Sequence, residues 1–195
     1  MRCSSSARAS RVIPKVLVSA GLATLLGLGF VPSPASAGAA TGKPIGGCSL
    51  LGAANATKIL GGPAAAVHEA NHRTSFGLVR GCTYSGAGID VPYTVTTYPS
   101  AAIAKRILST VSVKAHEPLD GMLLMGFGHP KIKGYPSVVD YFQLVPGEGE
   151  APPQFDFLSQ VIVRKGAAIL VTEAAADADA TPMLRKVASI VVPRM

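Results

Sequence analysis

The stretch Phe76-Gly-Leu-Val-Arg-Gly-Cys-Thr-Tyr-Ser-Gly-Ala-Gly-Ile-Asp-Val-Pro-Tyr-Thr-Val-Thr-Thr-Tyr98 decides the fold class. Two runs rich in apolar, β-branched and aromatic residues, 76–84 and 89–98, flank the small-residue segment 85–88. Such runs joined by a short Gly-rich turn predict a β-hairpin. Pro92 cannot donate a ladder hydrogen bond, so we expect the second strand to be an edge strand or to contain a bulge.

Helical patterns lie on both sides of this hairpin. Before it, Ser49 is a candidate N-cap for a helix over 50–60, which Gly61-Gly62-Pro63 would end. After it, Pro99-Ser100 opens a second helix, from Ala101 to about Val113. Its apolar residues recur at helical spacing, and they predict a buried face of Ile103, Ile107, Leu108 and Val111.

The C-terminal half predicts more strands and a last helix. Strands are expected over 137–145, 155–163 and 167–172, whereas Met122–Met125 is too short to classify by its period. Thr181 as N-cap and Pro182 at the first helical position start the last helix. Hairpins interspersed with helices predict an α+β fold, with a mainly antiparallel sheet and helices packed on one face.

The N-terminus has the order of a secretory signal peptide. Basic residues precede an apolar run from Val16 to Val31, and Ala35-Ser36-Ala37 forms an A-x-A cleavage site. We expect residues 1–37 to be cleaved, 38–47 to be a flexible tether, and 48–195 to form one domain. The apolar run is shorter than the ~20 residues of a membrane-spanning helix, although an uncleaved anchor is the alternative. No twin-arginine pair is present, so the general secretory route is favoured.

Cleavage changes the charge and the cysteine count. The full chain has 18 basic and 11 acidic residues, and all four charged residues of 1–37 are basic. The mature chain therefore keeps 14 basic and 11 acidic residues, a net charge of +3, which gives no case for nucleic-acid binding. Cys3 is removed with the signal, and Cys48 and Cys82 are expected to form a disulfide in an oxidising compartment.

Three segments carry a resemblance to a known group of proteins. They are Cys48-Ser-Leu-Leu51, Gly81-Cys-Thr-Tyr84, and the closing run 184–194. These segments resemble small exported proteins and lipoproteins of high-GC bacteria, chiefly actinobacteria, a family with no assigned biochemical activity. The resemblance implies a fold and a cell-envelope compartment, and it implies no reaction. This chain lacks the lipobox that many members of that family have.

The segment His68-Glu69-Ala70-Asn71-His72 matches the zinc motif H-E-x-x-H. On a helix this spacing puts both imidazoles on one face, where His68 and His72 would bind zinc and Glu69 would act as the base. The segment could be a short helix, because Pro63 suits a first turn. A solvated connection is the alternative that the polar residues after His72 favour.

A zinc peptidase needs a third protein ligand, and the sequence does not supply a clear one. Ser75 and Leu78 occupy the positions where a metzincin continues with Gly and His, and no Glu occurs between Glu69 and Glu117. The remaining candidates for a third ligand are Asp90, His116 and Glu117.

Two other groups of residues are weaker candidates. The segment Gly126–Lys133 contains His129 and two lysines, and its backbone N–H groups could bind an anion, although a solvated hairpin loop is the favoured interpretation. Tyrosines 84, 93, 98 and 141 lie on predicted strands, where they form either an aromatic surface patch or part of the core.

The sequence therefore favours a non-enzymatic protein over an enzyme. We expect an exported binding or interaction protein, secreted or held in the periplasm or cell envelope, that needs no cofactor. Its partner would be an unidentified envelope protein or a small ligand, with no nucleic acid and no stable membrane span after cleavage. The alternative is a small zinc metallopeptidase that uses His68, Glu69 and His72.

Overall fold

Antiparallel strands form one large sheet in the computed structural model, which describes residues 46–114, 121–146 and 150–195. The strands are β1 (Ala65–Thr74), β2 (Gly77–Gly86), β3 (Ile89–Thr97), β4 (Met122–Gly128), β5 (Lys131–Ile132), β6 (Tyr135–Leu144), β7 (Phe157–Lys165) and β8 (Ala168–Ala176). Seven strands follow the order β1-β2-β3-β8-β7-β6-β4, and β5 pairs with β6. The expected signal peptide, nearly all of the tether, His116 and Glu117 lie outside the described residues.

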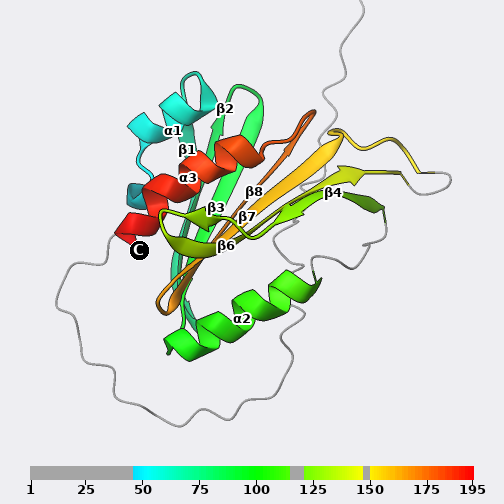
Figure 1. Cartoon of the computed structure of the whole chain (residues 1–195). Helices are drawn as coiled ribbons and strands as arrows, with labels where there is room; N and C mark the ends of the chain where they lie inside the picture. Colours follow the sequence, from blue (N-terminus) through cyan, green and yellow to red (C-terminus); the bar gives the residue numbers. More distant parts are fainter. Residues whose placement is uncertain (1–45, 115–120, 147–149) are drawn as a thin grey trace, which may run out of the picture. The chain divides into compact units, whose positions relative to one another are not determined.

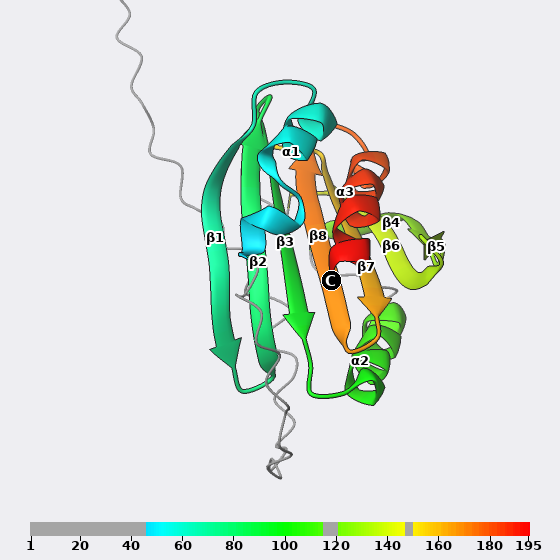
Figure 2. The same cartoon turned by 90° about the vertical axis from the view of Figure 1, so that its left-hand side faces the viewer.

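The helices are the 3-10 helix η3 (Gly47–Leu50), α1 (Ala53–Leu60), α2 (Ala101–Lys114) and α3 (Thr181–Arg194). Figure 2 looks onto the sheet face that carries α1 and α3, and Figure 1 shows α2 on the opposite side of the sheet. The described helices α2 and α3 have 14 residues each, fewer than the ~20 that cross a bilayer, and the described part of the chain offers no longer candidate.

The predicted α+β class, the antiparallel sheet and the disulfide are confirmed, but the placement of one helix differs. On β7, Val161 and Val163 pack with α3 in the larger core, whereas Ile162 packs with α2 in a second core. Successive side chains of a strand point to opposite faces, so a strand that is apolar at consecutive positions needs a cover on both sides. The expectation that the helices share one face is therefore wrong for α2.

The predicted hairpin is present as β2 and β3, but β3 is an interior strand between β2 and β8. The ladder between β3 and β8 runs from Tyr93 to Thr97, so Pro92 lies just outside it. Its carbonyl accepts a hydrogen bond of 2.9 Å from the Thr172 hydroxyl. The missing N–H of Pro92 therefore costs the sheet no ladder hydrogen bond with β8.

The first predicted helix is divided in two. Gly52, at φ 80°, separates η3 from α1, and it lets Leu50 and Leu51 both turn into the core. Ser49 does not cap a helix, because its hydroxyl donates to the Gly46 carbonyl at 2.7 Å. Gly61 ends α1 in the left-handed conformation, as predicted.

The helices α2 and α3 form close to the predicted positions. In α2, Ala104 is fully buried where Ile103 was expected to be, and Ile103 is exposed. The Ser100 hydroxyl accepts the Ile103 N–H at 3.3 Å and begins the helix. In α3, Thr181 is the first helical residue, and the Asp179 carboxylate accepts its N–H at 2.8 Å.

Candidate functional site

The H-E-x-x-H segment lies on strand β1 and not on a helix. His68 pairs with Thr83 and His72 with Val79 across an antiparallel ladder, so the short helix considered above is not formed. Because a strand rises ~3.3 Å per residue, the Cα atoms of the two histidines are ~13 Å apart along the chain direction. Side chains stand roughly perpendicular to a sheet, so the two imidazoles do not converge. To share one zinc ion, each imidazole would have to lie ~2 Å from it. The strand therefore does not build the helical zinc geometry.

Glu69 has a partner on the other face of β1. Its Oε1 accepts the backbone N–H of Cys48 at 3.0 Å, so this carboxylate holds η3 against the sheet. The histidines on either side of it alternate to the opposite face of the strand. Glu69 therefore cannot take a proton from a water bound between His68 and His72.

The candidates for a third ligand do not complete a site among the described residues. Asp90 pairs with Ser85 at the far end of the β2–β3 hairpin, beyond the strand position that faces His68. His116 and Glu117 lie outside the described residues. Within the described ranges, no three His, Cys, Asp or Glu side chains converge closely enough to hold a metal ion.

The segment Cys48–Leu51 is docked on the sheet by a set of polar contacts. Cys48 and Cys82 form the predicted disulfide, with Cα atoms 4.8 Å apart. The Tyr84 hydroxyl donates to the Cys48 carbonyl at 3.0 Å, and the Tyr93 hydroxyl donates to the Gly47 carbonyl at 2.6 Å. Tyr93 also accepts the Leu51 N–H at 3.2 Å. These two tyrosines therefore belong to the core and are not part of a surface aromatic patch.

Burial governs the titration of both tyrosines. Desolvation raises the pKa of the Tyr93 hydroxyl far above its usual value, and nearby Glu69 adds a smaller effect in the same direction. Desolvation, followed by the charge of Glu69, also raises the pKa of Tyr84. Both hydroxyls therefore stay protonated and keep donating to η3 at any physiological pH. The Cys-x-Leu-Leu and Gly-Cys-x-Tyr segments act here as a structural clasp.

A polar row crosses the sheet on the face that α2 covers. Asp140 of β6 pairs with Gln160 of β7, which in turn pairs with Glu173 of β8. Desolvation raises the pKa of Asp140 to about 7, and its Oδ1 has no hydrogen-bond partner among the described residues. Desolvation also raises the pKa of Glu173, and a hydrogen bond with Gln160 opposes that shift. The row thus holds two carboxyl groups that resist ionisation.

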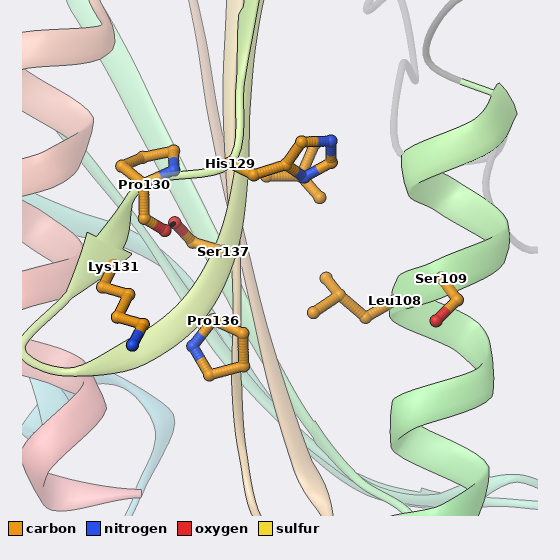
Figure 3. Close-up of a pocket in the computed structure, with 8 residues that line it drawn as sticks. Leu108, Ser109, His129, Pro130, Lys131, Pro136 and Ser137 are labelled. Atoms are coloured by element: carbon orange, nitrogen blue, oxygen red, sulfur yellow. Dashed lines mark hydrogen bonds between the residues drawn. The ribbon is translucent and has the colours of Figure 1, made fainter.

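A cavity of about 250 Å³ lies between α2 and the β5–β6 hairpin (Figure 3). Its lining comprises Leu108, Ser109, His129, Pro130, Lys131, Pro136, Ser137 and Val138. Both serine hydroxyls in the lining already donate hydrogen bonds within the chain. The Ser137 hydroxyl donates to the Pro130 carbonyl at 2.6 Å, and the Ser109 hydroxyl donates to the Lys105 carbonyl at 3.1 Å. Gly126–Gly128 belongs to strand β4, so the expected glycine-rich loop is largely a strand. The cavity is below the usual size of ligand pockets, ~300–1,000 Å³.

The outer edge of β4 exposes apolar side chains. In the described chain, six large hydrophobic side chains are exposed, and two of them lie on β4: Leu123 (54%) and Met125 (45%). A third, Val145 (44%), follows the neighbouring strand β6. Val145 is joined to the start of β4, because its N–H donates to the Gly121 carbonyl at 2.9 Å. An unpaired apolar edge strand presents backbone N–H and C=O groups that another strand can bind.

Neither the β4 edge nor the polar row was predicted from the sequence. The run Met122–Met125 has no charge and lies between two glycines. This pattern indicates an exposed edge strand only when the position of the run at the sheet edge is already known. Asp140 could have been found, because it is a single acidic residue inside the apolar run Val138–Phe142. A lone charge in a strand that is otherwise buried on both faces indicates a desolvated group.

Comparisons with known proteins give little further information. No family model and no curated protein matches the chain. A solved structure titled as a protein of unknown function, PA94 from Pseudomonas aeruginosa, putative regulator, is 19% identical over 66% of this chain and 99% of that chain. Its TM-score is 0.39, so it carries no argument about fold or function.

Proposed function

We propose that the protein is an exported, non-enzymatic interaction protein of the cell envelope that binds its partner through the β4 edge. The observation that carries this proposal is a group of exposed apolar side chains at an edge strand that pairs on one side only among the described strands: Leu123 and Met125 lie on β4, and Val145 lies beside the start of β4 at the end of β6. The Cys48–Cys82 disulfide is compatible with an oxidising, extracellular compartment. The resemblance to exported actinobacterial proteins of unknown activity supports the same compartment.

A site-specific crosslinking experiment tests this surface. A photo-crosslinking amino acid replaces Leu123 in the full-length chain, which is expressed in an actinobacterial host and irradiated in intact cells. The matched control carries the same amino acid at Val67, which is 59% exposed on the opposite edge of the sheet. We expect a defined crosslinked product from position 123 and none from position 67. Equal products from both positions, or none from either, would remove the β4 edge as the binding surface.

We further propose that the protein works without a bound zinc ion, because His68 and His72 are far apart on a strand. The exported protein, dialysed and measured by elemental mass spectrometry, should contain far less than one zinc per chain. A His68→Ala variant is the control. One zinc per chain that is lost in this variant would restore the metallopeptidase hypothesis, and a peptidase screen of wild type against Glu69→Gln would follow.

A further inference from the structure

The two edges of the sheet differ in how they are protected. The β1 edge carries Glu69 and Arg73, the two histidines, and a register irregularity between Ala66 and His68. Charges and bulges on an edge strand discourage pairing with other chains. The β4 edge has an irregularity between Leu124 and Gly126, but it has no charged residue from Gly121 to Gly128. Of the two described edges, β4 is the one open to strand addition.

Aromatic side chains lie on the sheet face next to this edge, with the polar Gln143 between Leu123 and Phe157. Leu123 pairs with Gln143, which in turn pairs with Phe157, so Leu123 and Phe157 lie on one face. The Phe157 ring is 6.2 Å from the Tyr141 ring. A Cβ atom at Gly126 would overlap the Tyr141 ring, which shows that this ring lies against the backbone of β4. A second strand added to β4 would therefore have Leu123 and the Tyr141 ring beside it for side-chain contacts, in addition to the backbone hydrogen bonds.

Charge arrangement indicates which strand fits there. In an antiparallel pairing about a twofold axis, the residue at the axis lies opposite its own copy, and every other residue lies opposite the residue at the same distance beyond the axis. A strand therefore pairs with its copy without repulsion when it places no like charges at such facing positions. β4 satisfies this condition because it has no charged residue. At its start, Glu150 lines the same shallow cavity as Gly121, and beyond its end lies the exposed Lys131. Antiparallel pairing would bring the acidic end of one copy to the basic end of the other.

We infer that β4 pairs antiparallel with β4 of a second copy of this chain, which joins two sheets into one continuous antiparallel sheet. All described strand pairs are antiparallel, so the added pairing continues the same ladder type. This inference rests on the proposed function, in that it names the partner of the proposed surface.

Analytical ultracentrifugation of the exported mature protein tests the inference. Sedimentation equilibrium over a wide concentration range should show a monomer–dimer equilibrium. Leu123→Lys should raise the dimer dissociation constant at least about tenfold, because each dimer would place two charges in the new apolar contact. The matched control, Val67→Lys on the β1 edge, should leave it unchanged. Circular dichroism confirms that both exposed-site variants are folded.

A charge-exchange series tests the orientation of the two strands. Lys131→Glu and Glu150→Lys should each weaken the dimer, and the double variant should restore most of the loss. A monomer at all concentrations, or a dimer that Leu123→Lys does not affect, would overturn the inference, as would single variants without effect. If the Leu123 crosslink then joined a chain of different mass, the proposed function would stand and the second copy would be excluded. No crosslink and no dimer would end both proposals.

Discussion

At the scale of single residues, Glu69 shows how a catalytic motif can have a structural role. Its carboxylate accepts the Cys48 N–H at 3.0 Å and is close enough to affect Tyr84. A hydrogen bond to a charged acceptor contributes more than a neutral one, but this one is solvent-exposed. We therefore expect Glu69→Ala to lower the free energy of unfolding by about 1 kcal/mol, as measured by urea denaturation.

Two variants distinguish this role from catalysis. Glu69→Gln keeps an acceptor for the Cys48 N–H, so it should recover most of the stability that Glu69→Ala loses. His68→Ala, on the opposite face of β1, should change the stability little. If Glu69→Ala and wild type unfolded at the same urea concentration, the structural role assigned to the carboxylate would be incorrect.

The buried carboxyl of Asp140 should make the free energy of unfolding depend on pH. Burial raises the pKa of this carboxyl from 3.8 to about 7, so between these values the folded state binds more protons than the unfolded state. The stability that its protonated form contributes is fully present below pH ~4, declines as the pH rises, and is lost above pH ~7. Asp140→Asn should therefore raise the free energy of unfolding at pH 8 by up to about 4 kcal/mol and change it little at pH 4.

Urea denaturation at several pH values checks this expectation. The exposed Asp156 provides the control, because Asp156→Asn removes one carboxyl group that is not buried. Glu173 shifts in the same direction, so the Asp140→Asn variant should keep a weaker decline of stability with pH. If wild-type stability instead increased between pH 4 and pH 7 and Asp140→Asn removed that increase, the folded carboxylate would have a cationic partner.

At the scale of secondary structure, the sequence predicted the elements that have one clear apolar pattern. Seven elements were found within a few residues of their observed bounds: α2, α3, β2, β3, β6, β7 and β8. β1 was missed because nearly all of its residues are exposed, so it has no alternation of apolar and polar side chains. Its strand conformation comes from pairing with β2, a tertiary effect that single-sequence patterns do not contain.

The disulfide that joins the η3 segment to the sheet should contribute to the free energy of unfolding. Cys48 and Cys82 are 34 residues apart, so the chain-entropy model gives a stabilisation of about 3–4 kcal/mol. A Cys48→Ser and Cys82→Ser double variant should lose about this much free energy of unfolding. It should still fold, because the Tyr84 and Tyr93 hydroxyls also bind this segment.

Reduction of the wild-type protein provides an independent comparison. The reduced protein should match the double variant in urea denaturation. Hydrogen exchange should accelerate at the Leu51 N–H in both, because the segment that carries it is less firmly held. An unchanged midpoint in both samples would mean that the clasp is held by the tyrosines and the buried leucines without help from the disulfide.

At the scale of the whole molecule, pairing between strands far apart in the sequence sets the strand order, which local sequence patterns do not predict. The junction of β3 with β8 joins residues about 75 positions apart and makes β3 an interior strand. The same junction, with the apolar residues at successive positions of β7, leaves a second face that α2 must cover. The β4 edge likewise exists as a candidate interface only because this strand order places β4 last. Local patterns carry no information about such an order.

The cysteine count gives a last prediction, about the processing of the chain. Cys48 and Cys82 are joined, which leaves Cys3, inside the expected signal peptide, as the third cysteine of the chain. Cleavage after Ala37 would therefore remove that remaining thiol.

Thiol titration of the exported protein in denaturant without reductant should find no free thiol, and N-terminal sequencing should begin at Gly38. One thiol per chain would indicate an uncleaved anchor, and two thiols on a chain that begins at Gly38 would refute the disulfide. The two measurements together thus separate the state of the N-terminus from the state of the clasp.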